Sequence, residues 1–376
     1  MCVSAAEHAE PSIAHRRSLA LRVPLLAFAA FALVAGLYGG LSRLGLPLGA
    51  PDLINLHGPL LISGLFGTLI GLERAVAIGA RWAYAAPAFA GLGTLLLLLG
   101  APTPFGAASY ATSALILSAA GLAITLRQPA VFTGTLLFSS LAWFVGNVLW
   151  SFGHSLPEVA GWWLAFLVLT IAAERLSLSR LLTPMRGSLP IFLFALGLVL
   201  VGAQNGIRTD SGAILFGSAL LVTTGWLLRN DIARFAIRQP GKVRYTAACM
   251  LAAYGWLAVA GLSLMALNAE TGLGYELAMH AALIGFVISV LFGHALVVLP
   301  AIIGMPANYR SWLYLPLILL NISVALRLGG GLWEWEFGRL ASGPATAAAI
   351  SCFAAMIFVS GRRPCSSEPA VCGEGR

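Results

Sequence analysis

Long apolar runs follow one another along the chain, separated by short stretches rich in Gly, Pro and charged residues. A helix needs about 20 consecutive apolar residues to cross the hydrocarbon core of a bilayer, so each run is typical of a transmembrane helix. The pattern predicts an all-α polytopic membrane protein with about 12 transmembrane helices. Numbered 1 to 12 in chain order, the predicted spans are 22–42, 53–78, 82–101, 106–126, 129–152, 157–180, 188–206, 209–229, 243–267, 274–304, 311–329 and 340–361.

The composition agrees with this class. Hydrophobic residues make up 59% of the 376 residues and charged residues only 10%, which is too few to cover a soluble protein of this size. We therefore expect one membrane domain over residues 22–361, a cytoplasmic N-terminal tail over 1–21 and a disordered cytoplasmic tail over 362–376. The expected partner is the lipid bilayer and not nucleic acid.

The distribution of basic residues predicts the topology. Twelve spans put both chain ends on one side, and of the 22 Lys and Arg only Arg43, Arg208, Arg327 and Arg339 then fall in outer segments. Cytoplasmic loops hold the excess of Lys and Arg, so we expect both termini in the cytoplasm. The expected location is the inner membrane of the cell. The formal net charge of +8 is then a topological signal that faces anionic lipid.

Three spans that lie four apart share features. Span 2 contains GTLIGLERAVAIG, span 6 contains LVLTIAAERLSLSRLL and span 10 contains ISVLFGHALVVLPAI at a corresponding depth. This suggests three four-helix units in a pseudo-threefold arrangement, over residues 22–126, 129–229 and 243–361. Chance similarity within a limited apolar alphabet is the alternative.

Three of the six histidines fall within predicted spans. His57 in span 2 and His280 in span 10 each come shortly after the start of spans that run in the same direction, so they lie at similar depth. Ionisable residues inside a membrane are costly and are functional candidates. Two neutral imidazoles that face each other can supply both axial ligands of one haem iron, whereas a single histidine near a helix end can simply bond a carbonyl group or a lipid headgroup.

The helical wheel extends the candidate site along span 2. At about 100° per residue, Gly64, Thr68 and Gly71 fall on the same arc as His57 and predict a flat, haem-facing surface. Small residues at this spacing also allow neighbouring helices to pack closely, and the sequence does not separate the two interpretations.

His294 comes fourteen residues after His280, about 21 Å along an α-helix, so the two cannot bind one iron. A second haem would require a partner histidine fourteen residues after His57, and that residue is Gly71. His294 is therefore a candidate five-coordinate haem ligand, proton-path residue or buried hydrogen-bonding group.

Two Glu-Arg pairs lie at the inner ends of their spans, Glu73 and Arg74 in span 2 and Glu174 and Arg175 in span 6. The glutamates can pair with arginines of neighbouring helices and so join the helices at the membrane interface. The alternative is a site for proton entry or for an anionic lipid headgroup.

Twelve helices with histidines on spans 2 and 10 resemble the main subunit of the haem-copper oxidases, whose second and tenth helices hold a low-spin haem. That resemblance implies one haem b on His57 and His280. The family's copper ligands are not matched, because span 6 has Ala-Ala-Glu-Arg and span 7 has no histidine. A copper ion is therefore possible but unsupported.

HGPLLISGLFGTLIG and HAALIGFVISVLFGH are more similar to the NnrS family, twelve-span haem- and copper-containing membrane proteins associated with the response to nitric oxide. This resemblance implies a role in electron transfer or nitric oxide handling, with an electron donor or a small nitrogen oxide as partner. Two other classes stay open, a proton-coupled secondary transporter that uses the three membrane histidines and a cofactor-free membrane scaffold.

Overall fold

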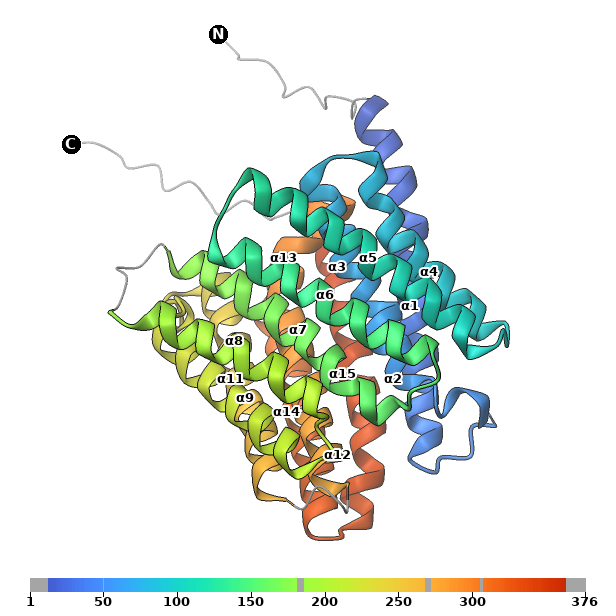
Figure 1. Ribbon diagram of the computed structural model, residues 1–376, viewed down its shortest axis with the longest axis vertical. Helices are drawn as coiled ribbons and strands as arrows, with labels where there is room; N and C mark the ends of the chain where they lie inside the picture. Colours follow the sequence, from blue (N-terminus) through green and yellow to red (C-terminus); the bar gives the residue numbers. More distant parts are fainter. Residues whose placement is uncertain (1–12, 50, 181–185, 268–271, 305–306, 363–376) are drawn as a thin grey trace, which may run out of the picture.

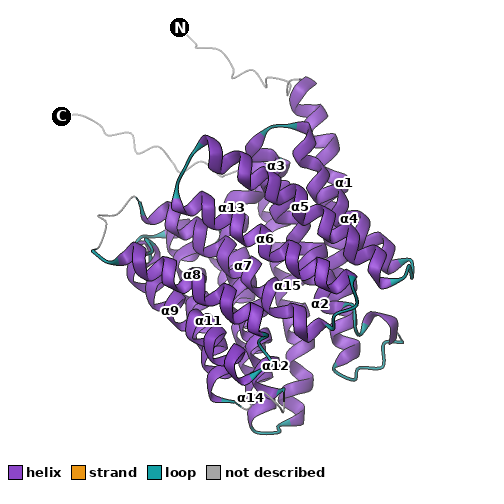
Figure 2. Cartoon of the chain, viewed as in Figure 1, coloured by secondary structure: helices purple, strands orange, loops and turns teal. Residues whose placement is uncertain are grey.

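The computed structural model describes residues 13–49, 51–180, 186–267, 272–304 and 307–362. These residues form helices joined by short loops and include no strand (Figure 2). The helices, in chain order, are α1 (Ile13–Arg43), η1 (Pro51–Leu53), α2 (His57–Pro59), η2 (Leu60–Phe66), α3 (Gly67–Ile78), η3 (Arg81–Tyr84), α4 (Ala85–Leu98), α5 (Thr103–Arg127), α6 (Val131–Ser151), α7 (Leu156–Ser179), α8 (Ser188–Asn205), α9 (Asp210–Asn230), α10 (Ala233–Ala236), α11 (Gly241–Ala266), α12 (Leu273–His280), η4 (Ala281–Ile288), α13 (Ser289–Ile303), η5 (Ser311–Leu313), α14 (Tyr314–Leu332) and α15 (Glu336–Arg362).

The prediction of an all-α polytopic protein is confirmed. Within the described residues, eleven helices are long and apolar enough to cross a membrane, and their bounds follow the predicted spans closely. Span 2 is one continuous helix made of α2, η2 and α3, and span 10 is one continuous helix made of α12, η4 and α13. Spans 6 and 9 correspond to α7 and α11.

The predicted span 82–101 is helical but short. Its α-helix, α4, has 14 residues and follows the 3-10 turn η3. Gly79 ends α3 and Gly100 follows the end of α4, both with positive φ angles. Glycine adopts this left-handed conformation at little cost. An α-helix of this length falls short of the approximately 20 residues that cross the hydrocarbon core.

The first helix extends into the predicted N-terminal tail, while its membrane-crossing part, Leu21–Arg43, agrees with the predicted span. α1 begins at Ile13, within the region 1–21 that we expected to be a tail. Hydropathy detects only the apolar part of a helix, whereas helical hydrogen bonding continues into polar residues that leave the membrane. The rest of that predicted tail, 1–12, and residues 363–376 of the predicted C-terminal tail lie outside the described part of the chain.

Large apolar side chains cover the outside of the helices. Phe31 on α1 is 63% exposed, Leu126 on α5 is 73% exposed and Phe194 on α8 is 60% exposed. So much exposed apolar surface is unfavourable in water and is the normal surface of a helix in contact with lipid chains. The surface therefore supports a multi-pass membrane protein.

Spans 2, 6 and 10 meet at the centre of the bundle. α7 is the most buried of the candidate spans. It contacts η4 of span 10, and α3 of span 2 contacts α13 of span 10. In Figure 1, α2 and α12 lie toward the lower end of the bundle, whereas α3 and α13 lie toward the upper end. The two histidine-bearing spans therefore run in the same direction beside the central helix, as the span count predicted.

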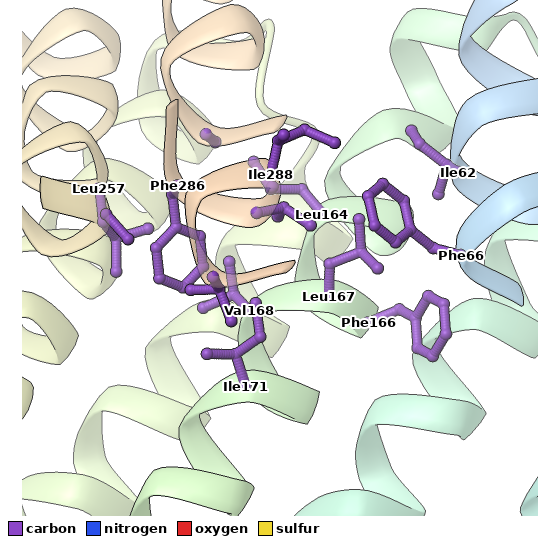
Figure 3. Close-up of a cluster of buried hydrophobic side chains, with 14 of the residues drawn as sticks. Ile62, Phe66, Leu164, Phe166, Leu167, Val168, Ile171, Leu257, Phe286 and Ile288 are labelled. Carbon is purple, nitrogen blue, oxygen red and sulfur yellow. The ribbon is translucent and has the colours of Figure 1, made fainter. Parts of the chain in front are cut away.

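The three central spans share an apolar core. Ile62 and Phe66 from span 2, Leu164 and Leu167 from α7, and Phe286 and Ile288 from span 10 belong to one cluster of buried side chains (Figure 3). Along span 2 this cluster lies between His57 and the pair Glu73 and Arg74. Along span 10 it lies between His280 and His294. It thereby separates two polar regions of the protein.

Candidate functional site

Two π-helical segments mark the site. η2 begins three residues after His57, and η4 begins immediately after His280. They are the only π-helical segments among the described residues. A π-helix widens the helical turn and is rare, and in proteins it occurs frequently at functional sites. A π-helical segment thus follows each of the two histidines that the sequence paired by depth, beginning three residues later in span 2 and one residue later in span 10.

The two imidazoles make matching hydrogen bonds. His57 Nδ1 lies 2.7 Å from the carbonyl oxygen of Ile54, and His280 Nδ1 lies 2.7 Å from that of Glu276. A carbonyl oxygen only accepts, so each Nδ1 carries the proton and each Nε2 keeps a free lone pair. Neither Nε2 has a hydrogen-bond partner within the described residues. This is the tautomer of a histidine that ligates a metal through Nε2.

The surroundings place the imidazoles near one another. His57 packs over Gly40 of α1, with its Cδ2 atom 4.0 Å from the position that a Cβ of residue 40 would occupy. His57 and His280 are electrostatic neighbours, and Arg327 of α14 is an electrostatic neighbour of both. Spans 1, 2, 10 and 11 thus contribute to one histidine site, which we define as His57, His280, Glu276 and Arg327.

Arg327 brings unused hydrogen-bond donors to the histidine site. Its Nη2 donates to the Glu276 carboxylate, and its side chain is 11% exposed. Its Nε and Nη1 are buried without a hydrogen-bond partner. A buried guanidinium nitrogen without a partner costs about 1–3 kcal/mol or more, so the site favours an additional anionic or acceptor group.

The predicted haem-facing surface of span 2 is filled by protein. A Cβ at Gly64 would lie 2.7 Å from Thr94 Oγ1 and 2.8 Å from Ala32 Cβ, and one at Gly71 would lie 3.2 Å from Pro87. Thr68 is fully buried, and its hydroxyl has no partner. The two glycines therefore serve helix packing, which was the alternative interpretation. The helical wheel does not apply here, because Gly64 lies within η2 and Thr68 and Gly71 lie beyond it, and the wider turns of a π-helix rotate such residues relative to His57.

A second polar region, the charged cluster, lies at the opposite ends of the same spans. It consists of Glu73 and Arg74 on α3, Glu174 and Arg175 on α7, and His294 on α13. Arg74 Nη2 donates to Glu174 Oε1 at 2.5 Å. The prediction that a glutamate pairs with an arginine of a neighbouring helix is confirmed for this pair. Glu73 makes no ion pair within the described residues, but its charge interacts with Glu174 and Arg74.

His294 is held by Arg175. The distance from Arg175 Nη2 to His294 Nε2 is 2.7 Å. A guanidinium only donates, so Nε2 accepts this bond and the imidazole is neutral with its proton on Nδ1. His294 is thus a hydrogen-bonding group, one of its three predicted roles. Its Nε2 is not free for iron, which argues against the predicted role as a haem ligand.

The sequence missed several groups that contact these sites. Glu276 and Arg327 join the histidine site, and Asp231, beyond α9, is an electrostatic neighbour of His294. Tyr254 of α11 donates a hydrogen bond to Asp231. The only sequence signal for these residues was that each is a charged residue close to a predicted transmembrane span. Among the described residues no group of three or more His, Cys, Asp or Glu side chains could hold a metal ion, so copper gains no support.

The fold and the two sites define a multi-pass α-helical membrane protein with polar groups buried among its central helices. The chain belongs to the family described as a domain of unknown function, DUF8744, whose family model matches residues 22–362. This range coincides with the predicted membrane domain. No curated protein and no solved structure matches the chain.

Proposed function

We propose that the protein binds one haem b between spans 2 and 10, with His57 and His280 as axial ligands. The observation that carries the proposal is the matched state of the two imidazoles. Both precede a π-helical segment, both hold their Nδ1 proton on a backbone carbonyl, and both leave Nε2 free. A histidine that serves only as a helix-end hydrogen bond needs none of this correspondence.

The remaining groups of the histidine site fit a haem. A haem is apolar over most of its area and carries two propionates. Arg327 has two unpartnered nitrogens that suit an anionic carboxylate, while Ile62 and other apolar side chains begin immediately below the histidines. His57 and His280 would hold the iron, and Arg327 would bind a propionate. Gly64 and Gly71 have no part in this arrangement because α4 and α1 already cover them.

A bound haem supplies one-electron transfer or binding of a small gas. The apolar core below the site would keep water and charge away from it. We propose a role in electron transfer or nitric oxide handling, following the resemblance to NnrS proteins, in the inner membrane with both termini in the cytoplasm. The histidine site would then lie near the outer surface.

The test is the haem content of the purified protein. The gene is expressed with haem supplied in excess, and the pyridine haemochrome assay measures the type and amount of haem per chain. We expect haem b in a ratio approaching one per chain. Folded protein that contains no haem would refute the proposal.

Replacement of Arg327 tests the predicted propionate contact. We expect Arg327→Gln to keep both axial ligands but to lose a charge-assisted hydrogen bond, worth about 1.5–3 kcal/mol, and therefore to bind haem about 10- to 100-fold more weakly. Arg234→Gln is the matched control, because the exposed Arg234 on α10 lies over the ring of Phe235, 4.4 Å from its centroid, and not in the histidine site. Haem titration of the apo-proteins measures both. Equal affinities in the two variants would contradict the contact.

The charged cluster favours a second candidate function, a proton-coupled transporter. Carboxylates, guanidiniums and an imidazole that meet at the interface of three central spans are typical of proton paths in membrane proteins. This function predicts a haem-free protein that drives solute uptake into proteoliposomes when a pH gradient is imposed. Uptake that persists in His294→Gln would exclude this histidine from the path.

A further inference from the structure

The charged cluster joins the three central spans through two kinds of bond. Glu174 of α7 accepts from Arg74 of α3, while Arg175 of α7 donates to His294 of α13. Adjacent residues of α7 thus bind span 2 on one side and span 10 on the other. We propose that this cluster is a proton-binding site, in which His294 takes the proton and Glu174 stabilises the resulting imidazolium. The inference does not depend on a haem at the histidine site.

The position of His294 Nε2 is the first argument. This atom lies 2.7 Å from Arg175 Nη2, a donor, and 3.8 Å from Glu174 Oε2, an acceptor. In the neutral imidazole, Nε2 accepts from Arg175. When hydronium gives a proton to Nε2, its O–H bond breaks and leaves water, an N–H bond forms with the imidazole lone pair, and the hydrogen bond from Arg175 to Nε2 is lost. The new N–H then has a carboxylate oxygen within a short side-chain movement.

Glu174 is arranged to receive this proton donor. Its Oε1 binds Arg74, and its Oε2 is the oxygen that faces His294. The carboxylate can therefore bind both cations at once, with one oxygen for each. Protonation would exchange a bond between α13 and Arg175 for an ion pair between α13 and Glu174, and the three spans would stay connected.

The carboxylates around His294 favour a proton over an anion. Glu174 of α7 and Asp231, beyond α9, are both electrostatic neighbours of this imidazole, opposite Arg175. Of the neighbouring groups on α11, Tyr254 donates to Asp231, and Lys242 donates to the carbonyl oxygen of Leu296 at 2.9 Å and not to a carboxylate. The two carboxylates would stabilise an added positive charge on His294, whereas they would repel an anion.

Arg175 indicates that the present bonding is incomplete. This residue is only 5% exposed, its Nε has no hydrogen-bond partner, and it makes no ion pair with a carboxylate within the described residues. A buried guanidinium whose main partner is a neutral imidazole can release that partner and bond water or another acceptor. His294 and Glu174 have side chains that are 23% and 21% exposed, so the cluster is not fully enclosed by protein.

The test measures the protonation of His294 directly. The protein is labelled at its imidazole nitrogens, reconstituted in lipid and followed by NMR across about pH 5 to 8, with the His294 signals assigned by their loss in His294→Gln. We expect the neutral form with its proton on Nδ1 at high pH and the doubly protonated form at low pH. His294→Asn provides the assignment if His294→Gln does not fold.

Two neighbouring variants distinguish the proposed partners. At a given pH, Glu174→Gln should lower the ratio of protonated to neutral His294, and Arg175→Gln should raise it, each by about tenfold for one unit charge at close range. Glu276→Gln, in the histidine site, should leave the ratio unchanged. A His294 that stays neutral throughout, or one whose ratio is the same in all three variants, would overturn the proposal.

Discussion

Replacement of His57 or His280 with alanine should abolish the low-spin haem spectrum of the protein. Each imidazole would supply one axial bond, and loss of a single ligand leaves the iron five-coordinate and weakly held. Since even second-shell changes cost metal sites about 10- to 100-fold in affinity, we expect more than a tenfold loss of bound haem in either variant. The measurement is the haem content and absorption spectrum of each purified variant.

Two other histidines provide the controls. His294→Ala should keep the spectrum because its Nε2 binds Arg175 in a different part of the bundle. His154→Ala should also keep it, because this side chain is 47% exposed in the loop before α7. His57 and His280 bond only backbone carbonyls of their own chain segments, so their alanine variants should remain folded. Haem retained at the wild-type level in both variants would rule out the ligand assignment.

Gly67→Ala should destabilise the centre of the protein. A Cβ at this position would lie 2.4 Å from Trp143 Cζ2 of α6. Trp143 cannot move aside easily, because it is fully buried, stacks on Phe166 at 4.9 Å between ring centroids and donates to Ser63 Oγ at 2.9 Å. Overpacking of this kind costs about 1–3 kcal/mol. Denaturant unfolding in detergent, followed by helical circular dichroism, measures the change.

Gly134→Ala is the matched control on the helix that carries Trp143. Nothing lies within 4 Å of a Cβ at Gly134, so the substitution adds no contact. Alanine is favoured over glycine within a helix by about 0.5–1 kcal/mol, and we expect this variant to be unchanged or slightly more stable. If Gly67→Ala and Gly134→Ala unfolded at the same denaturant concentration, the close packing of Gly67 on Trp143 would not contribute to the stability of the protein.

The spans could be predicted because transfer of apolar residues into lipid dominates the energy of each segment. The order, the approximate bounds and the helical class follow from that one property. The length of α4 did not follow, because Gly79 and Gly100 end their helices through backbone conformation and not through polarity.

The site was predicted in part. The Glu-Arg pairs were expected to bond across helices, as Arg74 and Glu174 do. The pairing of His57 and His280 by depth stays a prediction. Which residues of span 2 share a face with His57 could not be predicted. The helical wheel assumes regular α-helical turns, and η2 interrupts them. A π-helix depends on the packing of neighbouring helices and leaves no simple pattern in the sequence.

Hydrogen-bond partners from distant parts of the chain could also not be predicted from the sequence. Arg327 lies 51 residues after Glu276, and Arg175 lies 119 residues before His294. Each could be recognised as a charge near the membrane, but not as a neighbour of a particular histidine. The contact between spans 2, 6 and 10 brings them together, and the three-unit repeat that would have predicted this contact stays a prediction.

In the proposed arrangement two imidazoles, one from span 2 and one from span 10, hold one haem. Near-infrared magnetic circular dichroism of the oxidised wild-type protein tests it most directly, because the charge-transfer band of low-spin haem iron depends on the identity of both axial ligands. The account predicts the band of bis-histidine ligation. A high-spin spectrum, a band of any other ligand pair, or folded protein without haem would contradict it.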